Sequence, residues 1–194
     1  MKEESVGKEM QFRIEGISPL IMHNPQTADS LNPFSKEMKK ISKLRNRTDE
    51  QEMQLREIEW KAGIYYDAEA GPYIPDVNIM AMIVAGAKKF RKGTAILQGL
   101  QVITEINRLE YKGPRALDAL WNDKNFVDSR VVKLQKKSSL IRTRPIFKKW
   151  ACMFAVIYDD EVLDADEVRR AIEAGGKFCG LCDYRPMFGR FKIA

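Results

Sequence analysis

The sequence contains few histidines and cysteines, two residue types that many hydrolytic and metal-dependent enzymes place at their active sites. Its 194 residues include one histidine, His23, and three cysteines. It contains no phosphate-binding loop, dinucleotide-binding fingerprint, GxSxG or HExxH motif. A histidine-dependent nuclease needs a second acid or base beside His23, and no residue stands at a spacing that identifies one. We therefore expect a protein that is not an enzyme.

The cysteines do not form a metal-binding pattern. Cys179 and Cys182 make a single CxxC pair, and Cys152 lies in an apolar run, whereas a structural zinc site takes four ligands. We expect free, buried thiols, no metal and no cofactor. The odd number of cysteines and the charged N-terminal segment predict a reducing compartment without a secretory signal, and hence a cytoplasmic protein. The apolar runs fall short of the ~20 residues of a membrane span, so we expect no membrane association.

Acidic residues are absent from one long segment. Residues 129–158 contain no Asp or Glu, in a chain with a net charge of +6 and a pI of about 9.2. A local excess of positive charge attracts a polyanion and accelerates its encounter with the protein. A solvated edge hairpin protected by lysines is the alternative interpretation. The candidate phosphate-binding cations of this segment are Lys133, Lys136, Lys137, Arg142, Arg144, Lys148 and Lys149.

The first third of the chain predicts one strand followed by two helices. Residues 10–17 alternate between apolar and polar side chains, as in a half-buried strand, and residues 19–33 are expected to form a long ordered loop. Helical spacing of apolar residues in 35–44, and a capping box formed by Thr48 and Gln51, predict a helical hairpin. We place this helical insertion at residues 34–63, approximately.

The rest of the chain predicts further strands and three more helices, one of them a short helix over residues 116–121. A helix is expected after Asp76 or Asn78, and a strand over 100–109. A β-hairpin is expected over 130–136 and 140–147, and a central strand over 150–158. A helix capped by Asp164, a glycine-containing loop and a last strand over 188–193 complete the chain. We predict a single α+β domain over residues 1–194, with a ferredoxin-like (RRM-like) βαββαβ core and a helical insertion after the first strand.

Two segments are candidates for contact with a polyanion. Arg142 and Arg144 fall on one face of their strand because side chains alternate, and their separation of roughly 7 Å suits successive phosphates. In the C-terminal loop glycine permits close approach of the backbone to a phosphate, and arginine donates to it; tight turn geometry is the alternative role for the glycines. Trp150 and Tyr184 are candidates for stacking on bases. The candidate residues of the C-terminal loop are Gly180, Tyr184, Arg185, Gly189 and Arg190.

The C-terminal segment also resembles a known superfamily. The order of helix, glycine-containing loop and short final strand is similar to the RAMP superfamily of CRISPR-associated RNA-binding proteins. Gly180-Leu181, Phe188-Gly189-Arg190-Phe191 and the opening strand segment IEGISPL carry the resemblance. The resemblance implies RNA binding and assembly of subunits along the strand. The SPLIMHN, NPF, RTRPIF and FGRF segments are similar to phage-encoded proteins, which implies a phage or prophage setting in a bacterial cell.

Together these features predict a non-catalytic protein that binds single-stranded nucleic acid through its backbone. The resemblance favours RNA, a phage setting favours single-stranded DNA, and a homo-oligomer or a ribonucleoprotein subunit would fit either. Two alternatives stay open. One is an anti-defence protein that binds a protein complex. The other is a nuclease that uses His23, or a metal held by the acidic residues between Asp159 and Glu167, although acids at a turn and a helix start are common.

Overall fold

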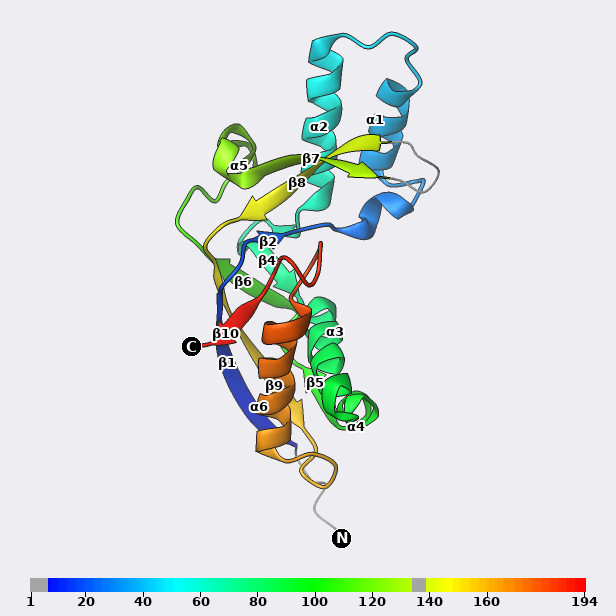
Figure 1. Ribbon diagram of the computed structural model, residues 1–194. Helices are drawn as coiled ribbons and strands as arrows, with labels where there is room; N and C mark the ends of the chain where they lie inside the picture. Colours follow the sequence, from blue (N-terminus) through cyan, green and yellow to red (C-terminus); the bar gives the residue numbers. More distant parts are fainter. Residues whose placement is uncertain (1–6, 134–138) are drawn as a thin grey trace.

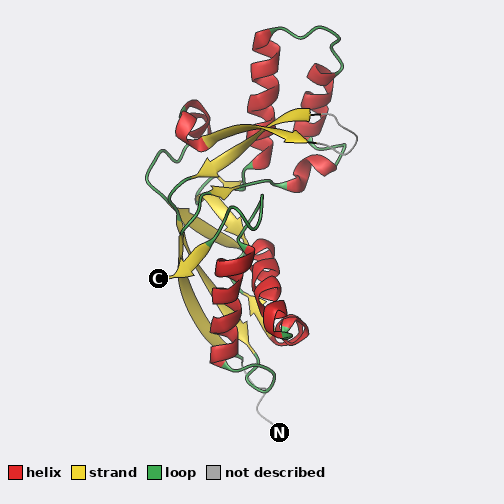
Figure 2. Cartoon of the chain, in the orientation of Figure 1, coloured by secondary structure: helices red, strands yellow, loops and turns green. Residues whose placement is uncertain are grey.

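The computed structural model, which describes residues 7–133 and 139–194, is a mixed α+β fold built on two antiparallel sheets (Figures 1 and 2). The larger sheet occupies the lower half of Figure 1, and the smaller sheet and the helical hairpin form the upper half. The α+β class predicted from the sequence is confirmed. None of the described helices is long and apolar enough to cross a membrane.

The larger sheet has seven strands, and all its pairings are antiparallel. Its spatial order is β10-β1-β9-β6-β4-β3, and β5 also pairs with β9. The strands are β1 (Lys8–Gly16), β3 (Tyr66–Asp67), β4 (Gly71–Pro75), β5 (Leu100–Val102), β6 (Ile106–Glu110), β9 (Ala151–Tyr158) and β10 (Phe191–Ile193). The alternation predicted for the first strand is confirmed, since Phe12 and Ile14 are buried and Gln11 is exposed. β9 is central, as predicted, with β1 on one side and β5 and β6 on the other.

Helices α3 (Asp76–Ala87), α4 (Gly93–Gly99) and α6 (Ala165–Ala174) cover one face of this sheet (Figure 1). The helices bury apolar side chains such as Ile83 and Val168 against Phe12 and Val156 of the sheet. The predicted capping box of Asp164 and Glu167 is present at the start of α6. No helix of the described residues covers the other face of the sheet, where Met153 on β9 is 51% exposed (Figure 1).

The smaller sheet holds the predicted β-hairpin. It has the order β2-β8-β7, formed by Leu20–Ile21, Ser139–Phe147 and Val127–Lys133. Helix α2 (Asp49–Gly63) packs against β8, and α1 (Pro33–Ser42) packs against α2. The predicted capping box of Thr48 and Gln51 starts α2. The short helix α5 (Leu117–Asn122) leads into the hairpin and contacts α2.

Three sequence predictions about the fold are corrected. The hairpin was expected to supply core strands, but β7 and β8 pair with β2 in a separate sheet, and β5 and β6 take the place beside β9. The strand expected over 100–109 is two strands, interrupted between Val102 and Ile106. The segment 19–33, expected to be a loop, contains β2 and the 3₁₀ helix Pro25–Ala28.

Candidate nucleic-acid interface

The loop after β2, helices α1 and α2, and strand β8 line a cavity of about 290 Å³. We call it the arginine cavity. Arg142 and Arg144 both line it, and Thr143 between them has its side chain fully buried. The remaining lining residues are His23, Asn24, Pro25, Thr27, Ala28, Met38, Glu59, Ala62 and Gly63. The alternation of β8 therefore brings the two predicted arginines into one site.

Glu59 of α2 holds Arg142 in place. Its Oε1 accepts from Nη1 of Arg142 at 2.7 Å, and its Oε2 accepts from the backbone N–H of Thr143 at 2.9 Å. The Glu59 side chain is 19% exposed, whereas that of Arg142 is 42% exposed. A guanidinium has five N–H donors, and among the described residues only one donor of Arg142 meets a carboxylate. The ion pair therefore orients the guanidinium and leaves donors for a ligand.

Arg144 is held by the C-terminal loop. It forms an ion pair with Asp183, and its guanidinium lies 4.8 Å from the ring centroid of Tyr184. Arg130 of β7 lies 4.9 Å from the same ring centroid, so two guanidiniums flank Tyr184. Asp128 in turn binds Arg130 through both its oxygens, at 2.6 and 2.7 Å. These contacts attach the C-terminal loop to the hairpin. They also occupy the Tyr184 ring, which the sequence assigned to base stacking.

His23 lines the same cavity, next to both arginines. Its side chain is exposed as a whole, but partial desolvation by its neighbours is the main cause that lowers the pKa of its imidazole, and the nearby Arg144 lowers it further. Asp183 and Glu59 oppose the shift. The side chain is therefore neutral at pH 7. The hydroxyl of Tyr65 donates to the backbone carbonyl of His23 at 3.1 Å and fixes this part of the loop.

The backbone N–H groups of the two glycines in the C-terminal loop donate to backbone carbonyls of the same chain. The N–H of Gly180 donates to the carbonyl of Gly175, and the N–H of Gly189 donates to that of Pro19. Both glycines have positive φ, 77° and 71°. A Cβ on Gly189 would lie 2.0 Å from the carbonyl oxygen of Leu181. Their backbone donors are therefore not available to a phosphate, and the geometry favours the alternative role in turn formation.

Trp150 also departs from its predicted role. Its side chain is 5% exposed, packs against Phe191, and donates its indole N–H to the carbonyl of Ser18 at 2.9 Å. The ring is part of the core and is not available to stack on a base. Its neighbours Lys148 and Lys149 are exposed and line a separate hollow of about 300 Å³ with Lys112. The structure thus separates the lysines from the aromatic ring that the sequence grouped with them.

The other predicted residues that the structure describes are not among the lining residues of the arginine cavity. Lys133 is exposed at the end of β7, and Lys136 and Lys137 fall outside the described residues. Arg185 is exposed beside Tyr184 in the C-terminal loop. Arg190 donates through Nε to the carbonyl of Pro186 at 2.8 Å, within the same loop.

Sequence reasoning missed Glu59, Asp183 and Arg130 as parts of the site. Glu59 is 83 residues from Arg142, and Asp183 is 39 residues from Arg144. Such pairs leave no local spacing in the sequence. The only local signal is the Asp128-Ser129-Arg130 order, because residues two apart on a strand share a face.

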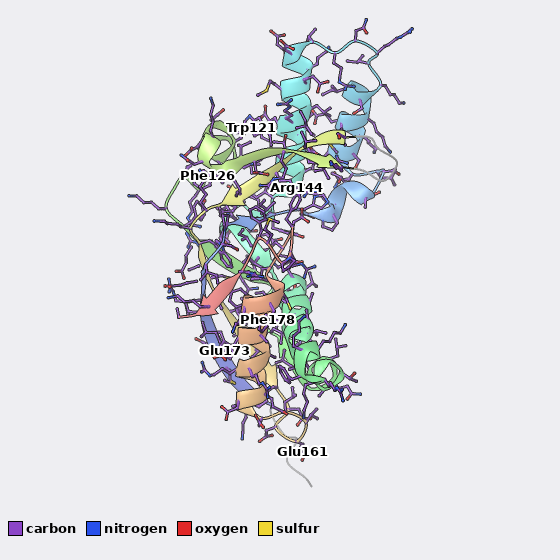
Figure 3. The ribbon with its side chains drawn as sticks, viewed as in Figure 1. Trp121, Phe126, Arg144, Glu161, Glu173 and Phe178 are labelled. Atoms are coloured by element: carbon purple, nitrogen blue, oxygen red, sulfur yellow. The ribbon has the colours of Figure 1, made fainter. Side chains whose placement is uncertain are left out.

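The cysteines and the acidic residues do not form a second centre. In residues 7–133 and 139–194, no group of three or more His, Cys, Asp or Glu side chains is placed to hold a metal ion. All three cysteines are free, and burial raises the pKa of Cys152 and of Cys182 to about 12. The acidic turn marked by Glu161 lies at the lower end of the molecule in Figure 3, whereas Arg144 lies in its upper half. Comparisons with protein-family models and with curated proteins give no match.

Proposed function

We propose that this protein binds single-stranded nucleic acid at the arginine cavity, through phosphate contacts and without catalysis, and that RNA is its preferred ligand. The observation that carries the proposal is the pair Arg142 and Arg144. Two guanidiniums from one strand line one cavity, each positioned by a carboxylate. Arginine donors fixed in this way match phosphate oxygens, because the planar fork gives two parallel hydrogen bonds.

Exposed lysines around the cavity support the proposal. Lys39 lies near the cavity on α1, and Lys133 extends the hairpin. Neither has a carboxylate within ion-pair distance among the residues described. Since Glu59 and Asp183 neutralise the two arginines, long-range attraction of a polyanion depends on these lysines and on Lys148 and Lys149. The arginines then supply the short-range contacts.

The uncovered face of the larger sheet is a poorer candidate. Arg13 on β1 forms ion pairs with Glu15 and with Glu110 of β6, at 2.6 and 2.9 Å, and Lys192 pairs with Glu15 at 3.6 Å. These side chains point away from the buried Phe12 and hence lie on the face opposite the helices. Carboxylates there match the cations in number. A phosphate would be repelled as much as attracted, so the proposed interface lies at the hairpin and not on this face.

The proposal includes a ferredoxin-like core and the RAMP-like character implied by the C-terminal segment. What supports the first is the strand order. Along the chain the core elements are β1, α3, β5 and β6, β9, α6 and β10, with β5 and β6 counted together as the second strand. Across the sheet the four strands lie in the order last, first, third, second, and neighbouring strands are antiparallel. The helical hairpin α1–α2 then interrupts the core after β1. What supports assembly along a strand is the separation between the acidic turn, marked by Glu161 at the lower end of Figure 3, and Arg144 of β8 in the upper half.

Fluorescence anisotropy with a labelled strand of about 30 nucleotides tests the proposal directly. The same sequence is offered as RNA, single-stranded DNA and duplex, across a salt series. We expect salt-dependent binding to a single-stranded form, tightest for RNA. Intact strands after incubation with magnesium would support a non-catalytic role, whereas cleavage that requires His23 would replace it with the nuclease alternative. Absence of binding to every form at low salt would overturn the proposal and favour a protein partner.

A further inference from the structure

A second cavity adjoins the arginine cavity and has a different character. It measures about 440 Å³ and lies between the helical hairpin α1–α2 and strand β8. The apolar side chains on its walls are Met38, Leu55, Leu140 and Ile141. The two cavities share Thr27, Met38, Glu59 and Arg142 as lining residues. The two cavities therefore adjoin, and we call them together the cleft: guanidiniums line one part, and the apolar chamber forms the other.

The apolar chamber is open to a ligand in this structure. Leu140 and Ile141 are 40% and 44% exposed, although large aliphatic side chains at the foot of a cleft are usually covered. The volume falls within the range of roughly 300–1,000 Å³ that small-molecule sites occupy. A ligand complementary to the whole cleft has an anionic group joined to a compact apolar unit. A nucleotide within a strand has this form, with its phosphate beside its base.

Two of the polar side chains around the chamber, Ser35 and Arg47, are already engaged, whereas Lys39 is exposed at its edge and has no carboxylate partner among the described residues. Ser35 donates its hydroxyl proton to the carbonyl of Thr27 at 2.9 Å. Arg47 forms an ion pair with Glu52, and its Nη1 donates to the carbonyl of Ser42. A base in the chamber would therefore meet apolar contacts on its faces and few free hydrogen-bonding groups at its edge. Such a site accepts any base, which suits a protein that recognises the backbone.

We infer that the apolar chamber takes one unstacked base of the bound strand while Arg142 contacts the adjoining phosphate. The inference rests on the proposed function and deepens it, because binding then needs bases as well as phosphates. Met38 stands at the junction of the two cavities and suits this role, since its flexible thioether packs against an aromatic ring. The chamber then increases the affinity for the strand and fixes which nucleotide lies beside Arg142.

The test compares an ordinary strand with one of equal length that keeps the sugar-phosphate backbone but lacks every base. It uses the wild-type protein, so the result does not depend on the folding of a variant. Stacking of a base on an aromatic side chain changes Kd by roughly 5- to 150-fold, and the aliphatic walls of this chamber should give the low end of that range. We expect binding of the abasic strand to be weaker by at least about fivefold, with an unchanged slope against salt because the phosphate contacts remain.

Two variants locate the effect. Leu55→Ala and Ile141→Ala remove apolar walls of the chamber, and we expect roughly tenfold weaker binding of the ordinary strand, again with an unchanged salt slope. Val131→Ala is the matched control. Val131 is the cross-strand partner of Ile141, is 65% exposed, and does not line the chamber. A strand carrying 2-aminopurine should brighten on binding, since a base that leaves the stack for a chamber without aromatic walls loses its quenching neighbours.

The outcomes separate the two proposals. If the wild-type protein binds ordinary and abasic strands equally and 2-aminopurine does not brighten, the base-binding role of the chamber is wrong while the phosphate-binding function stands. If the protein binds neither strand at low salt, both fail together. Equal weakening by Val131→Ala and Ile141→Ala would also overturn the inference, because the effect would then belong to the hairpin surface in general.

Discussion

Replacement of Glu59 by alanine tests how the arginine cavity is held together. Glu59 is the acceptor for both the Arg142 guanidinium and the backbone N–H of Thr143. Thr143 is fully buried, so the change leaves a buried donor without this acceptor, at a cost of about 1–3 kcal/mol. The ion pair with the half-exposed Arg142 contributes at most about 1 kcal/mol more. The expected loss of unfolding free energy is about 2–3 kcal/mol, because the two costs partly overlap.

Urea denaturation followed by circular dichroism measures this loss, and for a chain of this size the midpoint of thermal unfolding should fall by roughly 4–12 °C. Glu57→Ala is the matched control on the same helix. Glu57 forms only a partly exposed pair with Lys61, so its removal should cost less than about 1 kcal/mol. If Glu59→Ala proves no more destabilising than Glu57→Ala, then Glu59 does not hold β8 against α2 and the account of the cavity wall is refuted.

Three further outcomes follow from the same contacts. Gly189→Ala should destabilise the protein by more than about 2 kcal/mol in urea denaturation, because φ is positive and the new Cβ meets the Leu181 carbonyl; wild-type stability would contradict the turn geometry. His23 has a lowered pKa in the folded protein, so unfolding free energy should decrease as pH falls below about 6.5, and His23→Gln should weaken that decrease in parallel titrations. Tyr184→Leu removes a ring that contacts two guanidiniums and should cost about 1–3 kcal/mol, whereas Phe178→Leu, at an exposed ring that meets only Lys177 among the described cations, should cost under about 1 kcal/mol; equal losses would show that the two guanidinium contacts add nothing beyond that single cation contact.

The local elements were predictable from the sequence because local physics sets them. Asp164 and Glu167 satisfy the first N–H groups of α6 within four residues of chain, so their spacing alone identifies the helix start. The strand at Phe12 and Ile14 follows from alternation. The partners of each strand were harder to predict. No local sequence pattern in the hairpin distinguishes pairing with β2 from pairing with β9. In the structure the hairpin pairs with β2.

The site was predictable only where its residues are close in the sequence. Arg142 and Arg144 reach one cavity because they are two apart on a strand. Their carboxylate partners come from α2 and from the C-terminal loop, brought together by the fold. For Trp150 the prediction from local sequence was wrong. It follows two lysines in a basic segment, which suggested exposure, but it directly precedes β9 and its ring turns into the core.

The most direct test of the central claim is the affinity of the double variant Arg142→Ala/Arg144→Ala for single-stranded RNA across a salt series. The matched control is Lys88→Ala/Lys89→Ala, which removes two exposed cations that follow α3, away from the arginine cavity. Thermal unfolding first establishes that both variants are folded. The account predicts weaker binding and a salt slope reduced by up to about two for the arginine variant, with little change for the control. Equal changes in both variants would contradict the claim, because binding would then follow net charge and not the arginine cavity.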